Sequence, residues 1–138
     1  MREIVLVRHA AASGQQAEVP LTAEGCQQAS ALADVLLSLG SQRLIDSPFR
    51  RAIESVEPFA RRSGLTIETD QRLVERVLSV RGLPDWRSVV VTHGNLLALI
   101  LRWVDEKVGY EHWAQLSNPD VFVVQLDGVQ RSFRRAWT

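Results

Sequence analysis

The apolar run Ile4–Val7 ends abruptly at Arg8 and His9, and it constrains the fold of this chain more than any other stretch. Four apolar, mostly β-branched residues in succession are typical of a strand buried on both faces, as in a parallel sheet. The run Val89–Thr92, which His93 follows, repeats the pattern. Open α/β sheets bind their ligands at the carboxyl ends of such strands. The sequence therefore predicts buried parallel strands that end in ionisable side chains.

Helical patterns alternate with these strands. Apolar residues recur at helical spacing, with capping residues at the start of each pattern and glycines after the first two. The three predicted helices run from Thr22 to about Ser38, from Ser47–Pro48 to Gly64, and from about Asn95 to Val104. Ser47 is expected to cap the second helix, with Pro48 at its first position.

Shorter elements complete the pattern. Two further strands are predicted at Leu44–Ile45 and Leu65–Glu68, and a helical turn within Asp70–Val80. Val121–Leu126 and Val129–Ala136 are typical of a hairpin, with Asp127-Gly128 in a type I′ turn. The expected fold is α/β, a three-layer α/β/α sandwich whose mostly parallel sheet ends in an antiparallel C-terminal hairpin, as one domain over residues 1–138.

Composition limits the classes of partner. The chain has 16 basic and 16 acidic residues, and this balance argues against bulk binding to nucleic acid or an anionic membrane. Cys26 is the only cysteine, which favours a reducing compartment. The apolar run near the N-terminus is too short for a signal peptide, and no stretch approaches the ~18 apolar residues of a membrane span. We expect a cytoplasmic protein, with oligomerisation left open.

Five short motifs occur in a characteristic order. They are Arg8-His9, Leu21-Thr22-Ala23-Glu24-Gly25, Ser47-Pro48-Phe49-Arg50-Arg51-Ala52, Leu73-Val74-Glu75-Arg76 and His93-Gly94. A segment Asn118-Pro119-Asp120-Val121 leads into the last predicted hairpin. This ordered set resembles the histidine phosphatase superfamily, the phosphoglycerate mutase-like proteins. The resemblance implies a phosphatase that acts through a phosphohistidine intermediate.

The resemblance and the chemistry of phosphoryl transfer point to the same residues. A neutral imidazole can attack phosphorus and hold the phosphoryl group, and His9 is the candidate nucleophile. Arg8 and Arg51 would bind the phosphoryl oxygens, and His93 would stabilise the charge that develops on them. Glu75 occupies the position that the family uses for the acid that protonates the leaving group; a surface carboxylate paired with Arg76 or Arg72 is the alternative. The candidate substrate-binding residues are Arg8, Arg51, Gln15, Ser13 and Gly94.

Metal catalysis is the competing interpretation of two histidines. Zinc sites need three or four ligands, and His9 and His93 lack an obvious third partner. His112 lies beside Tyr110 and Trp113, where packing is the simpler role. We therefore expect neither a metal nor another cofactor.

Three departures from the family pattern bear on the activity. Ala10, Ala11 and Ala12 follow His9 where the family usually has Gly-Glu-Thr or Gly-Glu-Ser, and Gln15 stands where an Asn is usual. Residues 76–92 alone separate Glu75 from His93, which is too short for the helical lid of many members. An open site suits a phosphorylated small molecule or a phosphoprotein and argues against a mutase. Arg76, Arg81 and Arg87 flank the gap, and we expect at least one of them at the rim. The alternative is a non-catalytic phosphate-binding or scaffold domain of the same fold.

Overall fold

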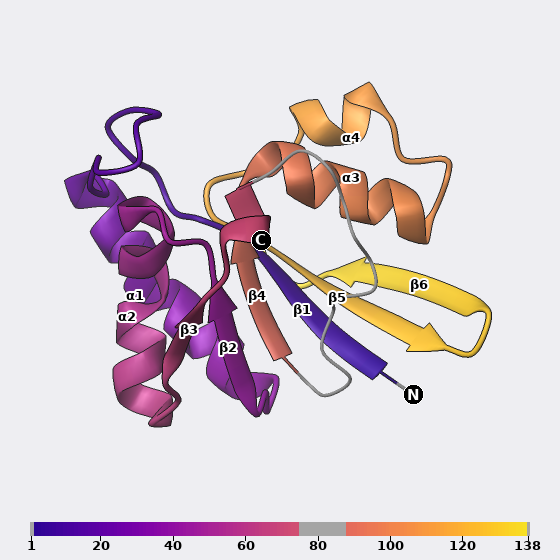
Figure 1. Cartoon of the computed structure of the whole chain (residues 1–138), viewed down its shortest axis with the longest axis horizontal. Coiled ribbons are helices and arrows are strands. Elements are labelled where there is room, and N and C mark those ends of the chain that lie inside the picture. The colour runs from indigo at the N-terminus through magenta and orange to yellow at the C-terminus, as the bar shows by residue number, and fades with distance from the viewer. Residues whose placement is uncertain (1, 75–87, 138) are drawn as a thin grey trace.

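A computed structural model describes residues 2–74 and 88–137, and its centre is one six-stranded sheet with helices on both faces (Figure 1). The strands are β1 (Arg2–Arg8), β2 (Arg43–Asp46), β3 (Ile67–Thr69), β4 (Ser88–Thr92), β5 (Asp120–Asp127) and β6 (Gln130–Arg135). The helices are α1 (Ala23–Ser38), α2 (Arg50–Ser63), α3 (Gly94–Val104) and α4 (Tyr110–Ala114), with a single 3-10 turn, η1 (Gln71–Val74), among the described residues. The strand order is β3-β2-β4-β1-β5-β6. β3, β2, β4 and β1 are parallel, and β5 and β6 are antiparallel additions, which confirms the predicted fold class.

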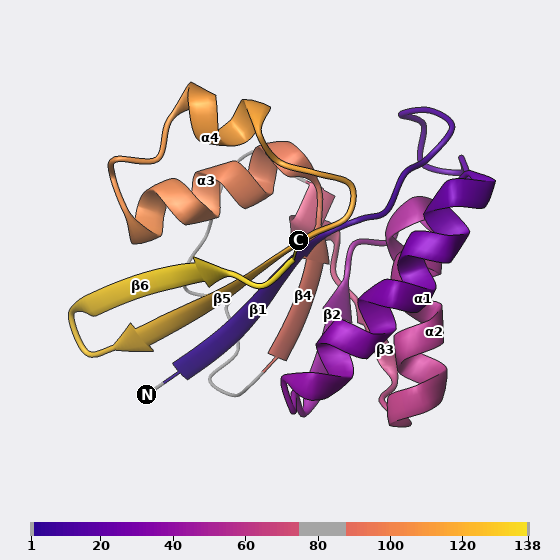
Figure 2. The ribbon, with the colours of Figure 1, turned by 180° about the vertical axis from the view of Figure 1, so that it is seen from behind.

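The alternation of side chains along β1 builds two separate cores. Ile4 and Leu6 face the layer of α3 and α4, whereas Val5 and Val7 face α1 and α2. All four are at most 1% exposed. The two views of the ribbon show the helical layers on opposite sides of the sheet (Figures 1 and 2). Because the strand is buried on both faces, the uninterrupted apolar run is the pattern that its position requires.

Helix α1 begins and ends as the sequence predicts. The Thr22 side chain accepts a hydrogen bond from the amide of Gly25, and Gly40 follows the helix with a positive φ of 65°. Gly64 ends α2 in the left-handed conformation, as expected. Among the described helices, no segment is both long and apolar enough to span a bilayer.

The predicted start of α2 is wrong. The helix begins at Arg50, with Phe49 as an extended N-cap that has no side-chain cap. Ser47 instead continues the pairing of β2 with β4, because its amide donates to the carbonyl oxygen of Val91 at 3.0 Å. Its hydroxyl is completely buried and accepts from the Phe49 amide at 3.3 Å. Ser47 is therefore free to contact the site rather than to cap the helix.

The hairpin turn and β3 also differ from the predictions. Asp127 pairs with Gln130, so the turn residues are Gly128 and Val129 rather than Asp127 and Gly128. Gly128 has a φ of 60°, while no described residue other than glycine has a positive φ. A positive φ at the first central position alone is the pattern of a type II′ turn, and a β-branched valine cannot supply the second positive φ of type I′. β3 begins at Ile67, two residues later than predicted.

Candidate active site

The carboxyl ends of β1 and β4 bring the two motif histidines together. Arg8 pairs in register with Thr92 in these adjacent parallel strands, so His9 and His93 follow at the same edge of the sheet. Their ring centroids lie 5.3 Å apart. Arg51 reaches the same place from the first turn of α2. With Arg8, these side chains line a cleft of about 370 Å³.

The hydrogen bonds of His9 fix its tautomer. Nδ1 lies 2.8 Å from the carbonyl oxygen of Ala10, which can only accept, so Nδ1 carries the proton. Nε2 receives the Nε–H of Arg51 at 3.2 Å and therefore presents its lone pair. Burial lowers the pKa of His9 to about 4, with smaller contributions from the charges of Arg51 and Arg8. The imidazole is neutral at pH 7, with the lone pair of Nε2 directed toward Arg51.

His93 is held by a serine that the sequence pattern assigned to a different task. Its Nε2 lies 2.8 Å from the buried Ser47 hydroxyl, and its Nδ1 lies 3.4 Å from Nη2 of Arg51. Because a guanidinium only donates, Nδ1 accepts and Nε2–H donates to Ser47. Burial lowers the pKa of His93 to about 3, with His9 and the two arginines as further causes. A bound phosphate dianion would raise both histidine pKa values, because opposite charge favours the protonated imidazole.

Arg51 is anchored by backbone carbonyls. Its Nη1 donates to the carbonyl oxygens of Gln15 and Gln16 at 3.0 Å each, and the residue is only 5% exposed. Its guanidinium carbon lies 4.9 Å from the centre of the Phe49 ring. Burial lowers the pKa of Arg51 from its usual value, although the guanidinium remains charged near neutrality.

Arg8 depends on a glycine for its position. A Cβ atom at Gly94 would lie 3.0 Å from the guanidinium carbon of Arg8, so a side chain there would press on the cation. Nη1 of Arg8 donates to the carbonyl oxygen of Leu116 at 3.0 Å, while its buried Nε has no hydrogen-bond partner within residues 2–74 and 88–137. Burial lowers the pKa of Arg8, and Asp120 opposes that shift. Arg8 is thus an incompletely satisfied cation beside the cleft.

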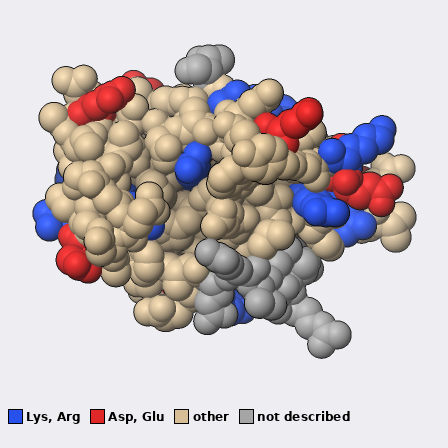
Figure 3. Space-filling view, turned by 90° about the horizontal axis from the view of Figure 1, so that it is seen from above, with Lys and Arg blue, Asp and Glu red and all other residues tan. Residues whose placement is uncertain are grey.

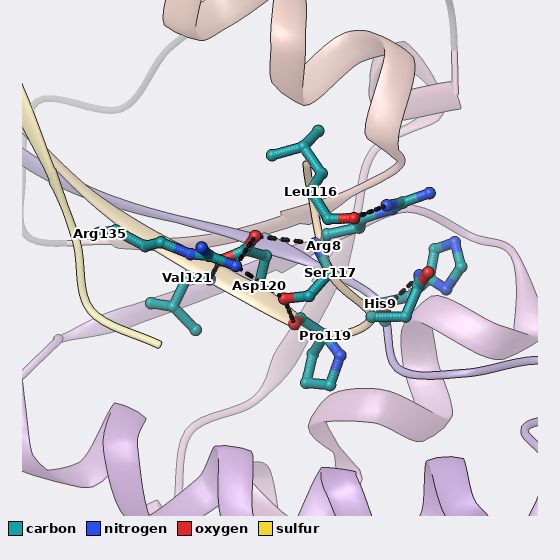
Figure 4. Close-up of polar contacts among 9 residues, drawn as sticks. Arg8, His9, Leu116, Ser117, Pro119, Asp120, Val121 and Arg135 are labelled. Atoms are coloured by element: carbon teal, nitrogen blue, oxygen red, sulfur yellow. Dashed lines mark hydrogen bonds and ion pairs between the residues drawn. The ribbon is translucent and has the colours of Figure 1, made fainter. Parts of the chain in front are cut away.

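The loop before β5 holds both Arg8 and His9. Leu116 supplies the carbonyl for Arg8, and the side-chain amide of Asn118 donates to the carbonyl oxygen of His9 at 3.1 Å. Asp120 organises this loop by accepting from the Ser117 amide at 3.0 Å. Figure 4 shows Arg135 and Ser117 approaching Asp120 while Arg8 extends toward Leu116. The Asp120 carboxylate therefore helps to fix the loop that holds Arg8 and His9.

The cleft is suited to an anion. Among the described residues, its lining includes Arg8 and Arg51 but neither aspartate nor glutamate. Figure 3 looks onto the face at the carboxyl ends of the strands, where acidic side chains lie toward the edges. Although the formal charge of the chain is zero, local clustering supplies the positive potential that a phosphate needs.

The other predicted site residues differ in whether they line the cleft. Gln15 and Gly94 line the cleft, and the Gln15 carbonyl binds Arg51. Ser13 is not among the lining residues, and its hydroxyl donates to the carbonyl oxygen of Pro20 at 3.4 Å. Glu75 lies outside the described residues, as do Arg76, Arg81 and Arg87. Within residues 2–74 and 88–137, no three potential metal ligands come together.

Sequence reasoning missed one wall of the cleft. Trp113 of α4 and Asn95 of α3 both line it, and the Trp113 indole donates to Asn95 Oδ1 at 2.9 Å. The family pattern places a covering element between Glu75 and β4, whereas this wall comes from the chain after α3. Tyr110 and Trp113, two aromatic residues close together in the sequence, are the local signal for this wall.

Comparisons with known proteins show the family through a sequence profile and the fold through solved structures. The sequence profile of the histidine phosphatase superfamily (branch 1) matches residues 4–88. The uncharacterised protein Rv0525 of Mycobacterium tuberculosis is 36% identical over 99 residues, which are 72% of this chain and 42% of that protein. The chain thus spans less than half the length of the curated relative that it matches.

Solved structures show the same fold at low sequence identity. A mycobacterial glucosyl-3-phosphoglycerate phosphatase in complex with VO3 has a TM-score of 0.76 and 19% identity, with 98% of each chain covered. The protein histidine phosphatase SixA with tungstate has a TM-score of 0.72 and 19% identity, over 96% of this chain and 94% of that one. Phosphoserine phosphatase of Entamoeba histolytica has a TM-score of 0.78 and 15% identity, over 100% and 98%.

Proposed function

The chain belongs to the histidine phosphatase superfamily, and from this premise we propose that it hydrolyses phosphomonoesters or phosphoprotein groups through a phosphohistidine intermediate on His9. The observation that carries the proposal is the fixed tautomer of His9. Its Nδ1 proton is bound to the Ala10 carbonyl, so Nε2 keeps its lone pair beside Arg8 and Arg51. A neutral imidazole among cations is the arrangement that nucleophilic attack on a phosphate dianion requires.

The first step transfers the phosphoryl group to the enzyme. Nε2 of His9 forms the N–P bond as the P–O bond to the leaving group breaks. Arg51 now contacts Nε2, so the phosphoryl group enters between them and takes over the Arg51 Nε–H. Arg8 and Arg51 offset the charge on the phosphoryl oxygens, and each charge-assisted hydrogen bond contributes about 1.5–3 kcal/mol.

The leaving alkoxide must receive a proton in the same step. The family motif assigns this task to Glu75, which must be protonated when substrate binds. In the second step, water attacks the phosphohistidine, the N–P bond breaks, and the Glu75 carboxylate accepts the proton of that water. With the phosphate dianion bound, the raised pKa of His93 favours the protonated ring, whose Nδ1–H then donates to the phosphoryl oxygens in both steps.

The names of the structural relatives favour a phosphorylated substrate without selecting one. They include a sugar-phosphoglycerate phosphatase, a phosphoserine phosphatase and a protein histidine phosphatase. Ala11 and Ala12 line the cleft without hydroxyl groups, and this observation favours the alternative of a non-catalytic phosphate-binding domain. Retention of both arginines and both histidines in one cleft favours the enzyme.

Hydrolysis of p-nitrophenyl phosphate tests the proposal against that alternative. Wild type should turn over this ester, and His9→Ala should lose at least about 1,000-fold in kcat because it has no nucleophile. His112→Ala is the matched control, since His112 is the third histidine and is exposed on α4. Its activity should equal that of wild type. Phosphate binding without turnover would instead support the non-catalytic domain.

A further inference from the structure

An apolar groove lies beside the proposed phosphate cleft, between α3 and α4. It has a volume of about 470 Å³, which is in the range of small-molecule sites. Ala98, Leu99 and Arg102 supply its α3 wall, and Val108, Tyr110 and Trp113 supply the opposite wall. Most of its lining is apolar, and Arg102 is the one cation among these lining residues.

Exposed apolar side chains are concentrated here. Leu99, Tyr110 and Trp113 are 40%, 76% and 41% exposed, and they are three of the five large hydrophobic residues exposed in the described part of the chain. The Tyr110 and Trp113 rings lie 5.5 Å apart at a tilt of 36°. Clusters of exposed apolar surface of this kind mark binding sites, whereas single exposed side chains need no explanation.

The groove is continuous with the phosphate cleft. Asn95 and Trp113 line both, and the hydrogen bond between them forms the boundary. Asn95 and Arg102 are seven residues apart on α3, which is about 10 Å along the helix at 1.5 Å per residue. A ligand whose phosphate lies in the cleft can therefore extend along α3 by roughly the length of two fused rings.

We propose that this groove binds the leaving group of the substrate, and that the preferred substrates are small phosphomonoesters of aromatic alcohols. The inference rests on the proposed function, because it requires phosphoryl transfer to His9. A flat ring packs against Trp113 and Tyr110 with little loss of conformational entropy, while its phosphate contacts Arg8 and Arg51. The groove thus supplies the contacts beyond the phosphoryl group that distinguish one ester from another.

Two esters of similar leaving-group acidity test the inference. Wild type should hydrolyse 2-naphthyl phosphate with a kcat/KM about 10-fold above that for phenyl phosphate, because the second ring enters the groove. Leu99→Ser and, separately, Tyr110→Ser should reduce this ratio to about threefold or less. Leu37→Ser is the matched control, because Leu37 on α1 is 37% exposed and does not line the groove. The control should keep the wild-type ratio and the wild-type kcat/KM.

The outcomes separate the two proposals. Turnover of both esters with equal kcat/KM would refute the aromatic groove and leave the phosphatase proposal standing. An unchanged ratio in both Leu99→Ser and Tyr110→Ser would also refute the groove, as would faster hydrolysis of a phosphohistidine peptide than of either ester. If wild type hydrolyses no phosphomonoester or phosphopeptide at all, the proposed function fails and this inference fails with it.

Discussion

Removing the guanidinium of Arg135 should destabilise the protein far more than removing that of Arg43, although the two ion pairs have nearly the same geometry. Arg135 donates two hydrogen bonds of 2.8 Å to Asp120, and Arg43 donates two of 2.8 and 2.9 Å to Glu68. The pairs differ in burial. The Asp120 side chain is 0% exposed, whereas that of Glu68 is 44% exposed.

Burial sets the size of the effect. In Arg135→Leu the Asp120 carboxylate keeps, among the described residues, the amides of Ser117 and Val121 as donors and remains inside the protein. Removing one partner of a buried pair costs about 3–5 kcal/mol, and the lower figure applies here because Arg135 itself is half exposed. A loss of about 3 kcal/mol lowers the Tm of a domain of this size by about 10 °C. Arg43→Leu should have little effect on the free energy of unfolding, because both members of its ion pair are already exposed to water.

The same variant should also weaken catalysis. Asp120 orders the loop whose Leu116 carbonyl holds Arg8, so loss of Arg135 should loosen Arg8, a proposed phosphate ligand that Arg135 does not touch. A displacement of about 1 Å costs up to about 100-fold, and we expect kcat/KM to fall by about 10-fold or more. Urea unfolding and aryl phosphate hydrolysis measure the two effects. Equal losses of stability in Arg135→Leu and Arg43→Leu would refute the reasoning.

Three further changes follow from the geometry. Burial raises the pKa of Asp46 to about 9, so the folded state holds a proton that the unfolded state releases; the free energy of unfolding should decrease between pH 7 and 9 by up to about 1.4 kcal/mol per pH unit, and urea titration of Asp46→Asn should show no such decrease. The His9 ring should remain neutral down to about pH 5. An NMR titration in which the His9 resonances shift near pH 6.5 in the phosphate-free protein would contradict its lowered pKa. Gly94→Ala should lower kcat/KM by displacing Arg8, and full activity in steady-state assays would show that the cation adapts.

The buried strands were predictable because their environment leaves a simple signature. A strand covered on both faces needs apolar residues at every position, so the runs Ile4–Val7 and Val89–Val91 can be recognised as strands from the sequence. The family motifs then place His9 and His93 directly after them. Some helix ends are equally predictable, because a capping side chain such as Thr22 or a left-handed glycine such as Gly64 is a feature of the local sequence. These features require no knowledge of distant contacts.

The residues that sequence reasoning misplaced or missed depend on contacts between distant segments. Ser47 is a residue type that favours the N-cap, but the pairing of its amide with Val91 and the approach of His93 give it other partners. Asp120 and Arg135 meet across the antiparallel β5–β6 pair, where register decides the contact. Trp113 reaches the cleft only because α4 packs beside α3. Local pattern carries no information about such pairings.

Rapid quench of the wild-type protein with a ³²P-labelled phosphomonoester tests the central claim most directly. During turnover the label should become covalently attached to His9 as a phosphoramidate, which is labile in acid and stable in base, and His9→Ala should carry none. The His93→Ala variant is a useful comparison, because it keeps the nucleophile and should still show label on His9, formed more slowly. Label retained by His9→Ala at the wild-type level would contradict the assignment of His9 as the residue that carries the phosphoryl group.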